Sequence, residues 1–302
     1  MKSKLFGALT ALLLASGSAA VAREPGIGNI VPSGATLGVP IGANPPPGFF
    51  FSSRTTFSFG ELKDANGDRS PLDVDLNVKA TVLQLHYTPG VTILGGDYRF
   101  MALLPVVNLD QKSSILGNAS GTEIGDLTIS PFNLSWMVEP GIFLTFGTSI
   151  NVPTGKFDPN GLSYGINSWG GTLEFGYSYL RDGWNASVHV VYSTQGTNKT
   201  TNYKSGDEVL VNVTAMKNMG DFSIGPIGYW RKQIEDDVNN GAFYGGGASG
   251  RAEQIGLGIG YARPLAGGEL NVNLMHDVMA KNTVGGTSLQ VNFSIPLGAK
   301  AN

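Results

Sequence analysis

Four charged side chains stand out in a sequence in which charged residues make up only 14% of the chain. Arg99, Glu174 and Glu208 occupy the polar positions of stretches in which apolar residues alternate with polar ones, and Asp126 opens another such stretch. A charge within the membrane-spanning height of a β-barrel usually faces the lumen. There it pairs with another charge or selects among passing ions. We therefore predict that these four residues line a lumen, with Arg99 near at least one of the carboxylates.

A second group of residues is of the type used by hydrolases. His276 falls on the apolar parity of its stretch, and Ser288 or Ser294 lies on the next one. A serine, a histidine and an orienting polar group at a membrane edge would suit a lipid hydrolase. Both serines have the opposite parity, however, so we assign no catalytic residue and keep a barrel lipid hydrolase as an alternative.

The sequence predicts no metal site and no cofactor. The three histidines lie on separate stretches without ligand spacing. The acidic run 235–237 lacks the spaced ligands of a calcium loop, and the alternating glycines of 256–260 do not open a helix, as a dinucleotide-binding motif would.

The stretches that carry these residues have the period of two expected of β-strands. From Phe49 onward we count twelve of them, in most of which one parity is plainly apolar. The apolar parity reverses near Pro131 and near Pro226. Because a proline cannot donate a hydrogen bond to its neighbouring strand, we predict a β-bulge at each of these two positions.

The links between the stretches alternate in length. The short links are 88–91, 138–141, 181–183, 218–220 and 264–268, and the long ones are 60–72, 108–122, 153–167, 195–206 and 232–250. An outer-membrane barrel sorts its links in this way, with short periplasmic turns at one rim and long extracellular loops at the other. We therefore predict an all-β fold: a closed antiparallel transmembrane β-barrel of about twelve strands over residues 49–302, closed because an open sheet edge in lipid leaves amides unpaired.

The N-terminal residues divide into two segments before the barrel. Residues 1–22 contain Lys2 and Lys4, a short apolar run and the small-x-small sequence Ala20-Val21-Ala22, which predicts a signal peptide that is cleaved before Arg23. Residues 23–48 are rich in proline and glycine and have no apolar periodicity. We interpret them as either a periplasmic arm or a plug inside the lumen. Without the two lysines the formal charge is mildly negative, which gives no support to nucleic-acid binding.

Several motifs along these stretches resemble a known family. They are 123–127 (EIGDL) followed by Pro131 and Trp136, 152–155 (VPTG), 165–169 (GINSW), 203–208 (YKSGDE), and Gly228-Tyr229 with Gln233 and Asp236. In this order, from about Phe49 to Leu297, they resemble the phenol meta-pathway degradation-like family of Gram-negative exported proteins, which is related to a sphingosine-induced outer-membrane protein group. The resemblance implies an outer-membrane transporter for hydrophobic or aromatic compounds, without assigning residues to that role.

The function predicted from the sequence is therefore an outer-membrane channel for small hydrophobic or aromatic compounds. A lumen of twelve strands lies between the filled interior of about 8 strands and the wide aqueous pore of 16 or more. Phe243 and Tyr244, in the long link 232–250, are candidates for contact with the substrate. The expected partners are outer-membrane lipid, the barrel assembly machinery and the compound itself. A soluble exported β-sandwich that binds a ligand is the remaining alternative.

Overall fold

The computed structural model describes residues 22–241, 243–244 and 250–298, which form strands and connecting loops but no helices. Twelve strands close into one antiparallel barrel, which confirms the fold predicted from the sequence. These strands are β1 (Gly48–Leu62), β2 (Val74–Thr88), β4 (Gly96–Ser113), β6 (Leu127–Glu139), β7 (Ile142–Val152), β8 (Gly170–Tyr179), β9 (Trp184–Gln195), β11 (Glu208–Asn218), β12 (Ser223–Gln233), β14 (Glu253–Leu265), β15 (Gly268–Lys281) and β16 (Val284–Leu297). In the described part of the chain, no helix is long and apolar enough to span a membrane.

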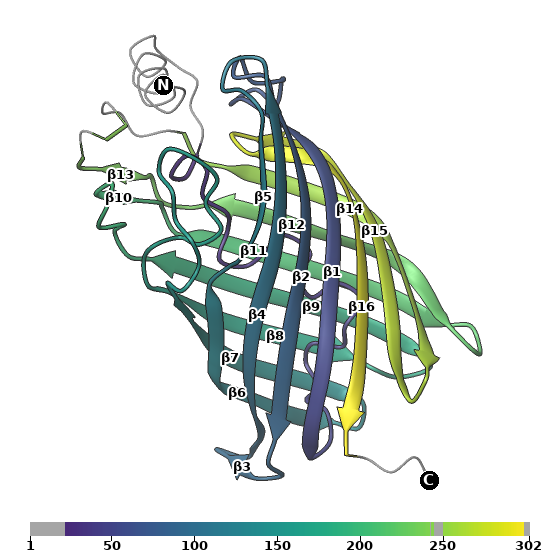
Figure 1. The fold of residues 1–302 in the computed structure, drawn as a ribbon. Coiled ribbons are helices and arrows are strands. Elements are labelled where there is room, and N and C mark those ends of the chain that lie inside the picture. Colours follow the sequence, from purple (N-terminus) through teal and green to yellow (C-terminus); the bar gives the residue numbers. More distant parts are fainter. Residues whose placement is uncertain (1–21, 242, 245–249, 299–302) are drawn as a thin grey trace.

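Four shorter strands extend or accompany the barrel. They are β3 (Thr92–Ile93) and β5 (Ala119–Ile124), which both pair with β4, and β10 (Tyr203–Lys204) and β13 (Val238–Asn239), which pair with each other. Strand β5 pairs with β4 at the end of the barrel where the long loops gather (Figure 1). We call this the loop end, and the opposite rim the turn end.

The barrel closes between its first and last strands. Strand β1 pairs with β2 on one side and with β16 on the other, from Phe49↔Leu297 to Leu62↔Val284. Figure 1 shows these three strands side by side at the front. Closure pairs the backbone amides that an open sheet would leave unsatisfied in lipid.

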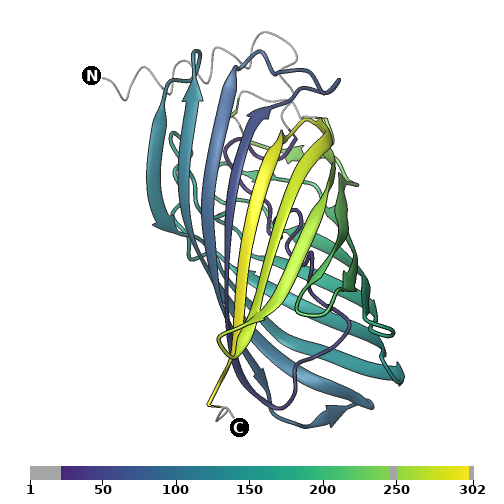
Figure 2. The same cartoon turned by 90° about the vertical axis from the view of Figure 1, so that its right-hand side faces the viewer.

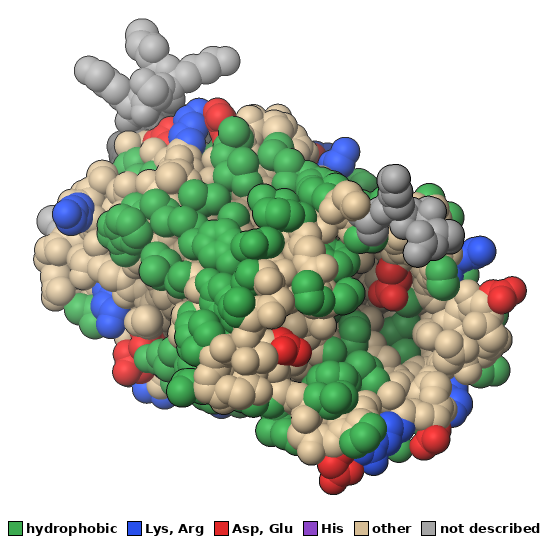
Figure 3. Space-filling model, turned by 90° about the horizontal axis from the view of Figure 1, so that it is seen from below, with side chains coloured by type: hydrophobic (Ala, Val, Ile, Leu, Met, Phe, Trp, Pro, Cys, Tyr) green, Lys and Arg blue, Asp and Glu red, His purple; other side chains and the backbone are tan. Residues whose placement is uncertain are grey.

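Side chains alternate between a buried inner face and an exposed outer face. On β11 the inner Leu210 and Met216 are buried, whereas the outer Val213 is 44% exposed. The outer face carries many exposed apolar side chains, such as Phe175 and Leu274. Figure 3, which views the molecule from the turn end, shows how widely hydrophobic side chains spread over that surface. This apolar exterior is what contact with lipid requires.

Of the two β-bulges predicted at prolines, only one is present. The register of β6 with β7 shifts between Ile129 and Phe132, so the bulge predicted at Pro131 is confirmed. The bulge predicted at Pro226 is wrong, because β12 keeps one register with β14 from Ser223 to Lys232. The apolar parity reverses there because the inward side chains Ile227 and Tyr229 enter an apolar core inside the barrel.

That core is built around the segment that precedes β1. Residues 23–47, which we call the arm, run through the barrel interior from the loop end to the turn end; Figure 2 shows them in purple inside the wall. Leu37 of the arm is fully buried. It packs in one cluster with side chains from five strands, namely Val191, Leu210, Met216, Ile227, Tyr229, Ala262 and Met275.

The composition of the arm suits this path. Successive backbone hydrogen bonds, such as Leu37 N to Gly34 O and Val39 N to Thr36 O, fold it into a chain of tight turns. Gly38 has a φ of +78° and lies where a Cβ would collide with the Asn271 side chain, so only glycine fits there. The arm therefore lies against the wall as compact turns and does not extend a β-strand.

Candidate functional site

The arm divides the interior into two unequal sides. Its hydrogen bonds run to the inner face of one side of the barrel, on Ser135 (β6), Ser178 (β8), Asn185 and His189 (β9), Asn212 and Thr214 (β11), Arg231 (β12), Gln254 (β14) and Asn273 (β15). Within the described residues, the arm makes no hydrogen bond to β1, β2 or β16, and its bond to β4 joins Asn44 to the Asp97 carbonyl at the turn end, at 2.7 Å. We call the inner faces of β1, β2 and β4 the free wall.

On β2 and β4 the free wall is apolar toward the loop end, whereas the adjoining inner face of β1 carries Thr56 and Ser58. Val78 pairs with Leu109, Ala80 with Val107 and Val82 with Pro105 across β2 and β4. Paired residues share one face of an antiparallel sheet, and this face also carries the buried Gln84 and Thr88, whereas Lys79, Leu83 and Leu85 of the opposite parity are exposed outside. The six paired side chains are half-buried. We call these six residues the apolar strip.

The free wall is positively charged from the edge of the apolar strip, where Arg54 pairs with Val82, toward the turn end. Arg54 donates to Asn292 Oδ1 at 3.0 Å, His86 Nε2 lies 2.9 Å from Ser52 Oγ, and Arg99 is 7% exposed. His86 is near enough to both arginines to interact electrostatically with them. Among the described residues, neither Arg54 nor Arg99 has an acidic partner within 4.0 Å. An arginine stays protonated in this setting, so this part of the lumen carries positive charge.

The predicted inward charges have distinct partners. Arg99 interacts electrostatically with Glu174 without touching it. Glu174 accepts hydrogen bonds from Ser149 at 2.8 Å and Thr172 at 2.7 Å. His189 Nε2 lies 3.4 Å from the same carboxylate. The structure thus brings Arg99 toward one of the carboxylates named from the sequence.

Glu208 pairs with the arm, at the opposite end of the lumen from Arg99. Its Oε2 lies 2.8 Å from Arg23 Nη1, and both side chains are buried. Sequence reasoning missed Arg23 as a functional residue because the arm has no periodicity that would place its side chains.

Asp126 lies at the loop end, where it holds the loop between β7 and β8. Its carboxylate accepts hydrogen bonds from Asn151 Nδ2 at 3.1 Å, Gly155 N at 2.7 Å and Ile166 N at 2.8 Å. Asp126 is buried, and the loop folds over Gly125 beside it. A carboxylate that collects backbone amides from both ends of a loop fixes that loop in place.

Replacing Asp126 by alanine should free the loop 153–169. The amides of Gly155 and Ile166 would then be buried without acceptors, at a cost of about 1–3 kcal/mol for such a group. Amide hydrogen exchange should be faster at Gly155 and Ile166 and unchanged in the turn between β8 and β9. Unchanged protection of both amides would contradict this role.

Phe243 and Tyr244 are placed differently from each other. Tyr244 is 3% exposed, and its hydroxyl donates to Glu24 Oε1 of the arm at 3.1 Å. Its ring meets those of Tyr203 and Phe243 edge-on. Burial raises the pKa of both Tyr244 and Glu24 above their ordinary values. Phe243 is 37% exposed, so of the two it is the one that a compound in solution can reach.

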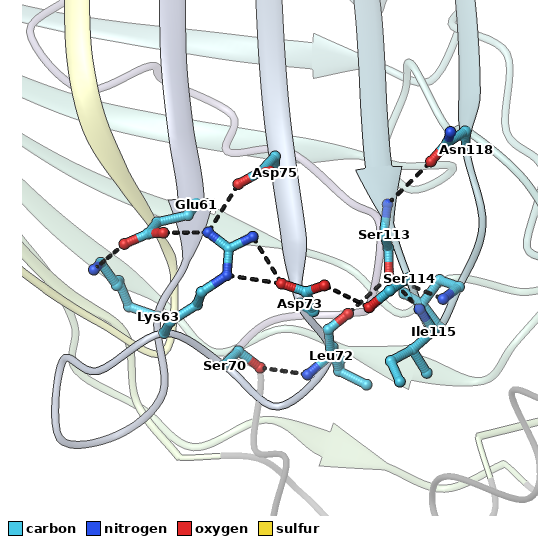
Figure 4. A network of polar contacts seen from close by, with 12 residues as sticks. Glu61, Lys63, Ser70, Leu72, Asp73, Asp75, Ser113, Ser114, Ile115 and Asn118 are labelled. Atoms are coloured by element: carbon cyan, nitrogen blue, oxygen red, sulfur yellow. Dashed lines mark hydrogen bonds and ion pairs between the residues drawn. The ribbon is translucent and has the colours of Figure 1, made fainter.

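The mouth of the lumen above the free wall is held by charged contacts at the loop end. The Arg69 guanidinium contacts Glu61, Asp73 and Asp75. Figure 4 shows this network at the ends of β1, β2 and β4, where Asp73 also bonds Ser114. The Ser114 hydroxyl and the Arg69 guanidinium hold the pKa of Asp73 below its usual range. Exposed pairs of this kind stabilise little singly, but together they tie the first loop to the β4–β5 hairpin.

His276 is not grouped with the two serines considered above. Its Nδ1 lies 2.9 Å from Thr287 Oγ1, whereas Ser288 pairs with Met275 and Ser294 with Glu269 on the adjacent strand. A hollow of about 700 Å³ near the loop end of β1, β15 and β16 includes His276, but no serine in the described chain lines it. No group of three or more potential metal ligands occurs among the described residues.

The closed wall, its apolar exterior and the arm inside it define the chain as an outer-membrane-type β-barrel with a partly filled lumen. The sequence model of the family described as "Putative MetA-pathway of phenol degradation" matches residues 59–293. The chain belongs to this family, which confirms the resemblance found in its motifs.

The fold is also that of a solved structure. An outer membrane channel from Pseudomonas putida has a TM-score of 0.75 at 17% sequence identity, over 88% of this chain and 100% of that one. The beta domain of the Bordetella autotransporter BrkA reaches 0.47 at 12% identity, over 83% and 100% of the two chains. The translocator domain of NalP from Neisseria meningitidis reaches 0.48 at 10% identity, over 85% and 91%. A search of curated proteins gives no match.

Proposed function

We propose that this protein is an outer-membrane channel of a Gram-negative bacterium that passes small hydrophobic or aromatic compounds between the arm and the free wall. The observation that carries the proposal is the apolar strip, whose side chains face the interior and are only half-buried. The interior of a channel for hydrophilic solutes is polar, whereas an apolar face suits an apolar solute. The same fold in the outer membrane channel from Pseudomonas putida and membership of the phenol-degradation family support a channel.

The proposed path has three parts. A compound enters at the loop end, where Phe243 is exposed, and Tyr244 supports that residue from within. It then moves along the apolar strip, with the arm on its other side. Finally it passes Arg54, His86 and Arg99 on its way to the turn end, where a polar or negatively charged group on the compound would be favoured.

The proposed export and membrane insertion of the protein are inferred from its sequence. Residues 1–22 would direct export and be removed, and the barrel assembly machinery would insert residues 49–302 into outer-membrane lipid. Residues 23–48 would act as a plug in the lumen, the second of the two alternatives considered above, and the hydrogen bonds of residues 23–47 to the inner faces of the strands support this role.

Uptake by whole cells tests the substrate class. Cells that express the protein should accumulate a labelled small aromatic hydrocarbon faster than cells without it. Val107→Asn, in the apolar strip, should reduce that gain. Val106→Asn makes the same substitution on the other face of β4 and should leave the gain in uptake unchanged. Equal uptake with and without the protein would contradict the channel, and equal loss in both variants would contradict the path.

Replacing Arg99 by glutamine should make the pore more selective for cations. The variant removes one positive charge from the turn end of the lumen, where Arg99 is buried. The reversal potential in a salt gradient across a planar bilayer should move toward the cation value. Arg263→Gln, at an exposed position, is the matched control and should leave the potential where it was. No change in the Arg99 variant would show that this side chain does not face the ion path.

A further inference from the structure

Arg99 is a buried cation whose charge the protein itself leaves unpaired. Its side chain lies on the inner face of β4 and is 7% exposed. Within the described chain it makes no hydrogen bond and no ion pair. Glu174, with which it interacts at longer range, is instead bonded by Ser149 and Thr172. A buried charge is costly unless it is paired and hydrogen-bonded, and an arginine stays charged. An anion that reached this guanidinium would therefore be stabilised.

Two further polar groups without partners lie beside Arg99. Tyr87 pairs with Phe100 across β2 and β4, so the adjacent residues Thr88 and Arg99 are neighbours on the inner face. Thr88 is 3% exposed, and its Oγ1 has no hydrogen-bond partner among the described residues. The same is true of His86 Nδ1, one inward position farther along β2. Three buried polar groups thus face one region of the lumen.

Apolar side chains adjoin this polar group toward the loop end. The inner face of β4 continues from Arg99 through Met101 and Leu103, both half-buried, to Pro105 of the apolar strip. Alternate residues of a strand lie about 7 Å apart, a span that one aromatic ring covers. Methionine sulfur also makes favourable contacts with aromatic rings. A ligand held at Arg99 would therefore have room for one ring against Met101 and Leu103.

We propose that Arg99, Thr88 and His86 bind the carboxylate group of a small aromatic acid. The planar guanidinium offers parallel N–H donors to the two oxygens of a carboxylate, and the Thr88 hydroxyl donates a further hydrogen bond. When the His86 proton is on Nδ1, that nitrogen is another donor, and Nε2 accepts from Ser52 Oγ at 2.9 Å. The acid reaches the site by the path of the proposed function, on which this inference rests, and it narrows the substrate class to aromatic acids.

Binding of fluorinated probes tests the site without requiring passage. The protein purified from outer membranes is kept in zwitterionic detergent micelles, and dissociation constants are obtained from the broadening of ¹⁹F NMR lines. 4-Fluorobenzoate should bind about tenfold or more tightly than 4-fluorobenzamide, its uncharged analogue, as a hydrogen bond to a charged group implies. Fluoroacetate, which has the carboxylate but no ring, should also bind more weakly. Equal binding of 4-fluorobenzoate and 4-fluorobenzamide would overturn the site.

Substitutions locate the binding within the lumen. Arg99→Gln should weaken the binding of 4-fluorobenzoate about tenfold or more and leave that of 4-fluorobenzamide unchanged. Thr88→Val should cause a smaller loss, whereas Arg263→Gln, the matched control at an exposed position, should cause none. Equal losses in the two arginine variants would contradict binding at Arg99. If the Arg99→Gln barrel does not fold, the comparison of the two probes on the unchanged chain decides.

The binding site and the channel can fail independently of each other. If toluene interrupts the ion current but 4-fluorobenzoate and 4-fluorobenzamide bind equally, the acid site is wrong and the apolar path stands. If 4-fluorobenzoate binds through Arg99 but no aromatic compound affects the current, the site stands and the channel is wrong. Displacement of 4-fluorobenzoate by inorganic phosphate as readily as by benzoate would overturn the assignment to a carboxylate.

Discussion

Deleting residues 23–47 should raise the single-channel conductance several-fold, the largest functional change that we expect from any alteration of this chain. The arm crosses the lumen from the loop end to the turn end and bonds seven of the twelve barrel strands along one side of it. No barrel strand includes any arm residue before Gly48, so the wall can close without it. Water would then fill the space that the arm leaves beside the free wall.

Recordings in planar bilayers measure this effect directly. Slower migration of heated than of unheated protein on a gel would show that the shortened chain still forms a closed barrel. A closed barrel whose conductance equals that of the full chain would contradict the place of the arm in the ion path.

Replacing Leu37 by alanine should lower the free energy of unfolding by about 2–5 kcal/mol, the range for truncating a buried leucine in a packed core. Leu37 is fully buried in the apolar cluster inside the barrel that includes Leu210 and Met216. The cavity left behind would lie between the arm and several strands, so the arm should also come out of the lumen more often. Unfolding in urea of the refolded protein in detergent micelles measures the change.

The matched control for Leu37 is Leu274→Ala on the outer face of β15. Leu274 is 50% exposed, so its truncation leaves no enclosed cavity and should cost clearly less. A similar loss at both positions would show that the interior around the arm is loosely packed and does not act as a core.

The strands of the barrel could be predicted from the sequence because each one obeys a simple physical rule. Lipid requires an apolar outer face, so Leu173 and Phe175 had to alternate with Glu174, and the parity of Arg99 and Glu208 followed in the same way. Pro131 showed where the regular pairing of β6 with β7 is interrupted. The same reasoning failed at Pro226, since Ile227 meets an apolar interior that no local pattern reveals.

The arm and the apolar strip could not be predicted for related reasons. A period of two tells which residues share a face but not whether that face meets lipid or lumen. In β2 the inner Val78 and Val82 are apolar while Lys79 lies outside. The apolar parity of β2 reverses between Val82 and Leu83, although no proline lies there. This reversal was the signal in the sequence that an apolar face lines the lumen. For the arm there was no comparable signal, because residues 23–47 have no apolar periodicity that would place their side chains.

The central claim is that apolar solutes move along the apolar strip, and the most direct test is the effect of such a solute on the ion current. Toluene added to single wild-type channels in a planar bilayer should interrupt the current in proportion to its concentration, whereas glucose at the same concentration should not. The interruptions should become rarer or shorter in Val107→Asn and stay unchanged in Val106→Asn. A current that toluene leaves untouched, or interrupts equally in both variants, would contradict passage along this wall.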